Sequence, residues 1–252
     1  MPSKREIIDD VAKYLRHMQN NGSDGVAIDP AIFDAQTAKP EQRRGKSEPT
    51  ASADRAANLR EIAGRIDQCR DCPLGETRNK TVPGTGCLDP DIMFIGEGPG
   101  RDEDLQGLPF VGRSGKILDR LIKRMGYSRD QVFIGNIVKC RATEDYQMKK
   151  DRAPSTEEMG ACIHYLVEQI SQVRPKVIVT LGNTALEGLF GFRGITKRRG
   201  KWLEYEGIPA MPTYHPSFLL RGGGDQGKRF WEVWEDMLMV FDQLGKQPPE
   251  SS

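Results

Sequence analysis

Apolar residues recur along this chain at two spacings, and the spacing separates predicted strands from predicted helices. Short apolar runs at 92–95, 132–138 and 177–181 predict buried β-strands, and 202–213 predicts a hairpin. Helical spacing is found at 56–66, at 114–125, from 155 onward, at 183–190 and at 230–244. Because strands alternate with helices, we predict an α/β fold with three layers, α/β/α, around a central, mostly parallel four-stranded sheet.

The first fifth of the chain has a different pattern. Residues 1–22 carry apolar positions at helical spacing, which predicts an amphipathic N-terminal helix. Residues 23–55 are poor in apolar side chains and predict a flexible linker. A globular domain is expected over 56–246, followed by a tail at 247–252. The helix is either a docking element or a binding site for a protein partner, and we expect the chain to be a monomer.

Charge and hydropathy restrict the surroundings of the protein. The 37 Lys and Arg residues nearly balance the 36 Asp and Glu residues, so any nucleic-acid surface must be a local patch. No apolar run approaches the roughly 20 residues that span a bilayer. The first residues lack the apolar core of a signal peptide, so we expect a cytoplasmic protein with no membrane contact.

Four of the five cysteines are spaced as metal ligands. Cys69 and Cys72 form a Cys-x2-Cys pair, and Cys140 and Cys162 follow in the domain. Thiols stay reduced in the cytoplasm, so metal binding is a better interpretation than disulfides. Four thiolates could hold a [4Fe–4S] cluster or a structural zinc, and the spacing does not separate the two; some could also be ordinary buried cysteines. Cys87 is left over and is interpreted as a bystander.

Polar and glycine-rich motifs follow the predicted strands. The turn Gly96-Glu-Gly-Pro-Gly100 lacks the lysine of a Walker loop and the spacing of a dinucleotide motif, but its glycines allow a ligand close to the backbone. Asn136 and His215 also follow strands, and sites in parallel sheets lie beyond the carboxyl ends of the strands. Phe110, in a glycine-bounded loop, could stack on a planar group or belong to the core. Asn136 could read a base edge or cap the backbone, and a lone histidine is often structural.

Three residues shortly after His215 are candidates for contact with nucleic acid. Leu219 and Leu220 could wedge into a base stack, and Arg221 could bind phosphate. A second basic run is Lys197-Arg198-Arg199. Charge runs are usually solvated surface, and that alternative stays open at this point.

Together these motifs resemble family 4 uracil-DNA glycosylases. The resemblance covers roughly residues 57–245 and rests on Gly96–Gly100, Glu103-Asp104, Pro109–Arg113, Asn136–Cys140, Arg152–Ser155 and His215–Arg221. It implies removal of uracil from DNA by flipping the nucleotide and hydrolysing the N-glycosidic bond, which leaves an abasic site. It also implies a [4Fe–4S] cluster on Cys69, Cys72, Cys140 and Cys162.

The resemblance assigns roles to the motif residues. Those implied for catalysis are Glu97, Glu103, Asn136 and His215. Those implied for substrate binding are Gly96, Gly98, Gly100, Phe110 and Asn136. Those implied for contact with uracil-containing DNA, single- or double-stranded, are Lys197, Arg198, Arg199, Ser217, Leu219, Leu220 and Arg221. A protein so bound to DNA would associate with the nucleoid.

The chain departs from related patterns at three places. Gly98 stands where other uracil-DNA glycosylases carry a water-activating aspartate, which leaves Glu97 and Glu103 as alternative acids. An extra segment, 144–150, is expected to be a surface loop. A related group that traps DNA covalently has a histidine in the 197–201 loop, and this chain has none. Two other functions remain as alternatives: a non-catalytic nucleic-acid-binding protein with a structural metal, and an iron–sulfur redox protein.

Overall fold

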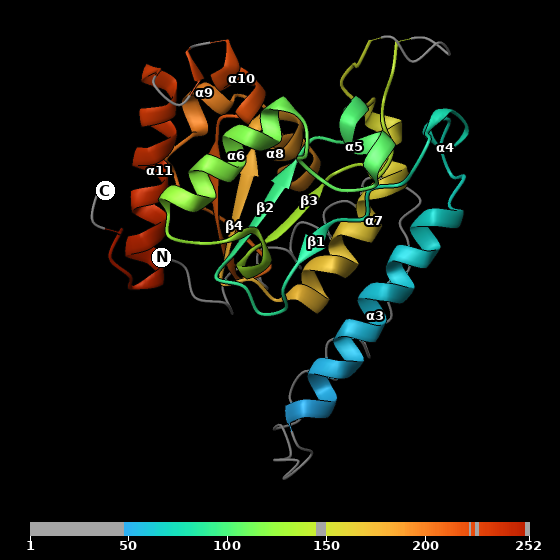
Figure 1. Ribbon diagram of the computed structural model, residues 1–252, viewed down its shortest axis with the longest axis horizontal. Helices are drawn as coiled ribbons and strands as arrows, with labels where there is room; N and C mark the ends of the chain where they lie inside the picture. The colour runs from blue at the N-terminus through green and yellow to red at the C-terminus, as the bar shows by residue number, and fades with distance from the viewer. Residues whose placement is uncertain (1–47, 145–149, 222, 225–226, 250–252) are drawn as a thin grey trace, which may run out of the picture. The chain divides into compact units, whose positions relative to one another are not determined.

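The apolar runs form the centre of a mixed β-sheet in the computed structural model, which describes residues 48–144, 150–221, 223–224 and 227–249 (Figure 1). The sheet order is β1-β3-β2-β4-β6-β5. Its strands are β1 Thr85–Gly86, β2 Ile92–Gly96, β3 Phe133–Asn136, β4 Val177–Leu181, β5 Leu203–Tyr205 and β6 Ile208–Thr213. The helices are α3 Glu48–Gln68, α4 Leu74–Thr77, α5 Arg101–Gln106, α6 Arg113–Arg124, α7 Thr156–Val173, α8 Gly182–Phe190, α9 Ile195–Arg198, α10 Pro216–Leu220 and α11 Lys228–Leu244, with a 3-10 turn at Arg129–Gln131.

The α/β class is confirmed, but the strand number was wrong: the sheet has six strands rather than four. The four central strands are parallel, and β1 and β5 add to the edges as antiparallel strands. The two-residue β1 carries no hydrophobic signal. A Cβ on Gly86 would lie 2.0 Å from the main-chain oxygen of Val132, so close pairing selects glycine here.

Alternating side chains of the central strands divide the core into two layers. In β2, Ile92 and Phe94 face α6 and α11, whereas Met93 and Ile95 face α3 and α7. Figure 1 shows these two helix pairs on opposite sides of the sheet. The strands are buried on both faces, which is why they read as continuous apolar runs in the sequence.

Helix α7 begins as its sequence predicts. The Ser155 hydroxyl accepts a hydrogen bond from the Glu158 N–H at 3.2 Å, and the Glu158 carboxylate accepts one from the Ser155 N–H at 2.7 Å. This reciprocal capping box satisfies two otherwise free N–H groups at the helix start. It also fixes the start of the helix that carries Cys162.

The N-terminal boundary differs from the prediction. Helix α3 begins at Glu48, inside the segment 23–55 that was assigned to a linker. Arg55 donates hydrogen bonds to Asp89 and to the main-chain oxygen of Gln172, so it belongs to the domain. The predicted helix at 1–22 and the linker up to residue 47 lie outside the described residues.

Two further predictions concern the loop at 144–150 and membrane-spanning helices. At the base of the extra loop, Thr143 bridges Asp151 in antiparallel fashion, and the Lys150 ammonium pairs with Glu144 at 2.8 Å. Residues 145–149 of this loop lie outside the described part of the chain. Among the helices that are described, none has the length and apolar character needed to span a membrane.

Candidate functional site

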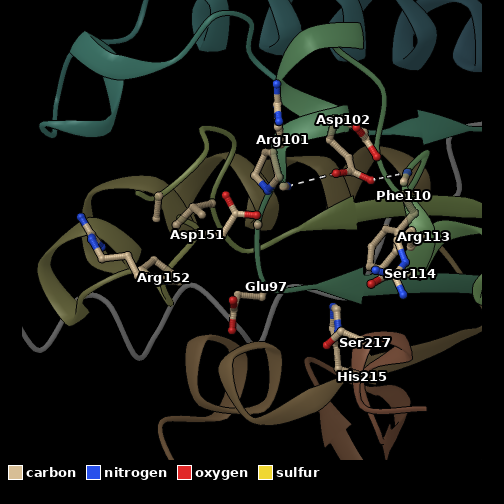
Figure 2. A pocket seen from close by; sticks show the side chains of 18 residues that line it. Glu97, Arg101, Asp102, Phe110, Arg113, Ser114, Asp151, Arg152, His215 and Ser217 are labelled. Atoms are coloured by element: carbon tan, nitrogen blue, oxygen red, sulfur yellow. Dashed lines mark hydrogen bonds between the residues drawn. The ribbon is translucent and has the colours of Figure 1, made fainter. Parts of the chain in front are cut away.

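A pocket of about 350 Å³ opens at the carboxyl ends of the parallel strands (Figure 2). The glycine-rich turn after β2, the Phe110 loop, the loop after β3 and the start of α10 all contribute side chains to it. Of the residues singled out in the sequence, it is lined by Glu97, Gly98, Gly100, Glu103, Phe110, His215 and Ser217. Arg113 and Arg152, which the resemblance includes without a role, also line it, and sequence reasoning assigned no role to the further lining residues Asp102, Ser114 and Asp151.

His215 is held in one orientation at the N-cap of α10. Its Nδ1 accepts a hydrogen bond from the Ser217 N–H at 3.1 Å and lies 2.8 Å from the Ser217 hydroxyl oxygen. Because Nδ1 is an acceptor, the proton of the neutral ring is on Nε2. Burial lowers the pKa of His215 to about 4. The imidazole is therefore a neutral hydrogen-bond donor at neutral pH.

Phe110 is fixed by a strained but well-supported loop. Its φ of 52° is in the left-handed region, and its ring centroid lies 5.7 Å from that of His215. Arg129 donates a hydrogen bond to its main-chain oxygen at 3.0 Å. A Cβ on Gly115 would lie 1.8 Å from that same oxygen, so the start of α6 can approach the loop only with glycine there. The ring is thereby presented at the pocket wall with 5% exposure.

The two acids proposed from the sequence have different surroundings. The Glu103 carboxylate accepts hydrogen bonds from the N–H groups of Gly100, Val111 and Gly112, at 3.1, 2.8 and 2.8 Å. Figure 2 draws two of these bonds as dashed lines. With this many main-chain donors, Glu103 ties the glycine-rich turn to the Phe110 loop. The structure thus favours a supporting role over the catalytic role expected for Glu103.

Glu97 remains available to the pocket. Its carboxylate accepts a hydrogen bond from the Thr184 hydroxyl of α8 and lines the cavity. The neighbouring Gly98 packs tightly, because a Cβ there would lie 2.6 Å from Cγ2 of Val138. An aspartate at position 98 would require Val138 to move. Tight packing against Val138, in the segment after β3, therefore accounts for glycine at position 98.

Asp151 is a second carboxylate at the pocket. Arg141 binds its Oδ1 through Nε and NH2, each at 2.6 Å, and the Arg141 side chain is only 4% exposed. The other oxygen lies near the glycine-rich turn, since a Cβ on Gly100 would be 3.5 Å from Oδ2. No sequence pattern marks Asp151, which follows the extra loop and lies in none of the apolar or glycine-rich motifs.

Asn136 lies behind the pocket at the end of β3 and is not among its lining residues. Its side chain is 1% exposed, and its Oδ1 has no hydrogen-bond partner among the described residues. Buried amides rarely stay unpaired, so this oxygen marks a place for a ligand donor. A Cβ on Gly96 would lie 2.5 Å from both Asn136 Oδ1 and Phe110 Cζ. The missing side chain at Gly96 lets these two residues meet.

The basic residues divide into paired and available groups. Arg199 is bound to Asp236 at 2.8 Å and helps to stabilise α11, although burial still raises the pKa of Asp236 to about 6. Arg198 stacks on Phe192 at 4.4 Å, and Lys197 precedes Arg198 in the same helix, α9. Arg221 lies 5.9 Å from the Phe218 ring. None of these four lines the pocket.

One of the two leucines predicted to wedge into DNA is buried in the structure. Leu219 is 1% exposed and belongs to the core between α6 and α10, so it cannot enter DNA in this conformation. The five-residue helix α10 buries one side, and the residue after Leu219 lies at the edge of that side. Leu220 is partly buried and remains the candidate wedge.

The four spaced cysteines line one small cavity on the α3–α7 side of the sheet. Its walls are formed by Cys69, Cys72, Cys140 and Cys162, with Arg78, Lys139 and Tyr165 beside them. Arg78 donates to the Cys140 sulfur at 3.1 Å, and the main-chain N–H groups of Leu74 and Gly75 approach Cys72. Burial raises the pKa of the Cys162 thiol to about 11, which the nearby Lys139 charge opposes. Cys87 is not part of this cavity.

In the described part of the chain, no group of three or more His, Cys, Asp or Glu side chains is placed to hold a metal ion. All five cysteines are free thiols, so the four that face the cavity are not engaged in disulfides.

Comparison with known proteins connects this architecture to a family. The profile described as the uracil DNA glycosylase superfamily matches residues 83–238. A type-4 uracil-DNA glycosylase from Thermotoga maritima is 42% identical over 189 residues, covering 74% of this chain and 94% of the relative. Another from Sulfurisphaera tokodaii is 43% identical over 173 residues, covering 65% and 76%. A third, from Archaeoglobus fulgidus, is 39% identical over 202 residues, covering 76% and 96%.

The environment of His215 generates a pH prediction. An unfolded imidazole binds a proton near pH 6.5, whereas the folded one does so only near pH 4. Between these values the unfolded state binds more protons, so His215 makes the fold less stable as the pH falls from 6.5 toward 4, by at most about 3 kcal/mol. In an NMR titration we expect the His215 ring to titrate near pH 4, with the resonance assigned by its loss in His215→Gln. Titration near pH 6.5 would contradict this environment.

Proposed function

The chain belongs to the uracil-DNA glycosylase superfamily and, within it, to the type-4 enzymes, and we propose that it hydrolyses the N-glycosidic bond of uracil in DNA through the pocket around Glu97, Phe110 and His215. The family relationship supports excision of uracil as a step of DNA repair. The observation that carries the site assignment is the unpaired Oδ1 of Asn136 beside the Phe110 ring, next to a neutral, oriented His215.

Uracil reaches this site only after leaving the duplex. Flipping a nucleotide costs a few kcal/mol, which contacts made by the protein must offset. Leu220 would fill the vacated space, and Arg221 and the α9 residues Lys197 and Arg198 would supply positive charge for phosphates. Arg199 contributes less, because Asp236 already neutralises it.

Recognition follows from the donor pattern of the base. The Phe110 ring stacks on the flipped base, and the Asn136 Oδ1 accepts the hydrogen bond from uracil N3–H. The Asn136 amide nitrogen then donates to O4. Cytosine has an acceptor at N3 and a donor at position 4. The Asn136 oxygen would then face another acceptor, and the Asn136 amide nitrogen would face another donor.

Bond cleavage requires stabilisation of separated charge. As the C1′–N1 bond breaks, the base leaves as an anion and the sugar becomes cationic. The Nε2–H of His215 donates to uracil O2, where negative charge develops, and a neutral ring needs no proton loss during this step. Glu97 stabilises the sugar cation or positions the attacking water, with Asp151 as a second acid at the same pocket.

We infer that the cysteine cavity holds a [4Fe–4S] cluster, as the resemblance to type-4 enzymes implies, because its four thiols could supply one thiolate per iron. Arg78 and the N–H groups near Cys72 could offset thiolate charge. The bound cluster would supply a rigid link between α3, β3 and α7, with no part in bond cleavage.

The activity is tested with an oligonucleotide that carries one uracil. After incubation with iron-replete protein and treatment with alkali, we expect cleavage at the uracil, in single strands, duplexes or both. His215→Ala should lower the rate by about 10²–10³-fold, because it removes a donor to the leaving group. DNA that stays intact with the wild-type protein refutes the proposal, and binding without an abasic product would favour the non-catalytic alternative.

The two acids should respond differently to removal of charge. Glu97→Gln is expected to lower kcat by about 100-fold with little change in KM, since the lost charge acts on the transition state. Glu103→Gln keeps an oxygen that can accept from Val111 and Gly112, so we expect a smaller loss of kcat and a stability loss of about 1 kcal/mol. Equal losses of kcat in the two variants would argue against this division.

The cofactor proposal has a matched pair of cysteine variants. Wild-type protein and Cys87→Ser should each contain four irons per chain and show the same visible absorption. Cys140→Ser should lose iron and melt at a lower temperature, because α3, β3 and α7 lose their link. Iron loss in Cys87→Ser but not in Cys140→Ser would overturn the ligand assignment.

A further inference from the structure

Lys139 is a fully buried cation between the two sites. Its side chain is 1% exposed, yet it lines the cysteine cavity. Its ammonium donates to the main-chain oxygen of Asn136 and to Oε1 of Gln169, each at 2.7 Å. One residue therefore contacts the uracil-reading segment and the proposed cluster site at once.

The partners of this ammonium are neutral. Within the described part of the chain, no Asp or Glu forms an ion pair with Lys139. Gln169 cannot supply charge, and its amide nitrogen is already bound to the Pro83 oxygen at 2.7 Å. An ammonium has three donors, and two are used. Burying an unpaired ammonium costs several kcal/mol, so this position calls for a nearby anion.

The cysteine cavity is where that anion would be. The positive charge of Lys139 opposes the rise in the pKa of the Cys162 thiol, and the main-chain N–H of Lys139 approaches the Cys162 sulfur. Four thiolates carry more negative charge than the iron core neutralises, so a bound [4Fe–4S] cluster is anionic. Charge and hydrogen bonds near a cluster are among the factors that set its reduction potential.

The other contact of Lys139 leads to the substrate. Asn136 ends β3 in register with Gly96 of β2, and the following Ile137 N–H donates to the Gly96 oxygen at 3.0 Å. The ammonium binds the carbonyl of Asn136, while the side chain of Asn136 carries the unpaired Oδ1. A shift of Lys139 would move the segment that orients this amide.

We propose that Lys139 is the counter-charge of the cysteine-bound cluster and that its hydrogen bond to Asn136 makes uracil binding depend on occupancy of the cysteine cavity. Lys139 is thus a positioning residue for uracil recognition. This inference rests on the cofactor and site assigned above, but it concerns a residue outside both sets of ligands.

The test compares iron-loaded Lys139→Met with Lys139→Arg, which keeps the charge, and with Lys123→Met, an exposed lysine of α6. Lys139→Met should shift the cluster's reduction potential to a more negative value, because a positive charge next to the reduced cluster is lost. It should also weaken inhibition by free uracil by about tenfold or more. Lys139→Arg should restore the potential at least in part, and Lys123→Met should match wild type in both readouts.

A second measurement needs no variant. Iron is removed from the wild-type protein by chelation, under conditions where far-UV circular dichroism shows that the fold is retained, and uracil binding is followed by NMR. We expect weaker binding and a shifted Asn136 amide resonance, with the β5–β6 turn at 206–207 unchanged. Equal uracil affinity with and without iron, or an unchanged potential in iron-loaded Lys139→Met, overturns the role of Lys139.

These outcomes are distinct from failure of the parent proposals. Wild-type protein that binds no iron refutes the cofactor assignment, and wild-type protein that leaves uracil in DNA refutes the activity. Wild-type protein that does both, alongside an unaltered Lys139→Met, refutes the inference alone.

Discussion

The absence of a side chain at Gly96 is the constraint on which the site depends. A Cβ there would lie 2.5 Å from both the Asn136 amide oxygen and the Phe110 ring. Because β2 and β3 are parallel neighbours, Gly96 and Asn136 meet at the same sheet edge, and the Phe110 loop can close over them. Three segments that are separate in sequence therefore meet at one place beside the pocket.

The surrounding structure keeps this surface from collapsing. Glu103 binds three main-chain N–H groups across the glycine-rich turn and the Phe110 loop, and Gly115 lets α6 approach the same loop. His215 is oriented by Ser217 and kept neutral by burial. In the proposed function, these polar groups are held ready for a planar base, because a buried polar group without a partner would be costly.

The core layer between the sheet and helices α3 and α7 differs from the layer under α6 and α11, because it contains the cysteine cavity. The cysteine cavity joins α3, β3 and α7 on the sheet face opposite α6 and α11. Successive residues after the end of β3 point in different directions. The Lys139 side chain, which lines this cavity, therefore reaches the main-chain oxygen of Asn136. A short stretch of five residues, 136–140, therefore contains the buried Asn136 amide with its unpaired oxygen, the buried Lys139 cation and a cysteine of the cavity, Cys140.

Local pattern was enough to predict the alternation of strands and helices, the start of α7 near residue 155, the cysteine set and the strand-end motifs, because each depends on residues that are close in sequence. It failed where a role depends on contacts across the fold. Burial of Leu219 under α6, the backbone bonds of Glu103, the pairing of Asp151 with Arg141 and the two-residue β1 have no local signal. The sequence by itself determined which chemical groups the site contains. Only the tertiary structure decided which of them face the pocket, since that depends on long-range packing that leaves some polar atoms paired and others free.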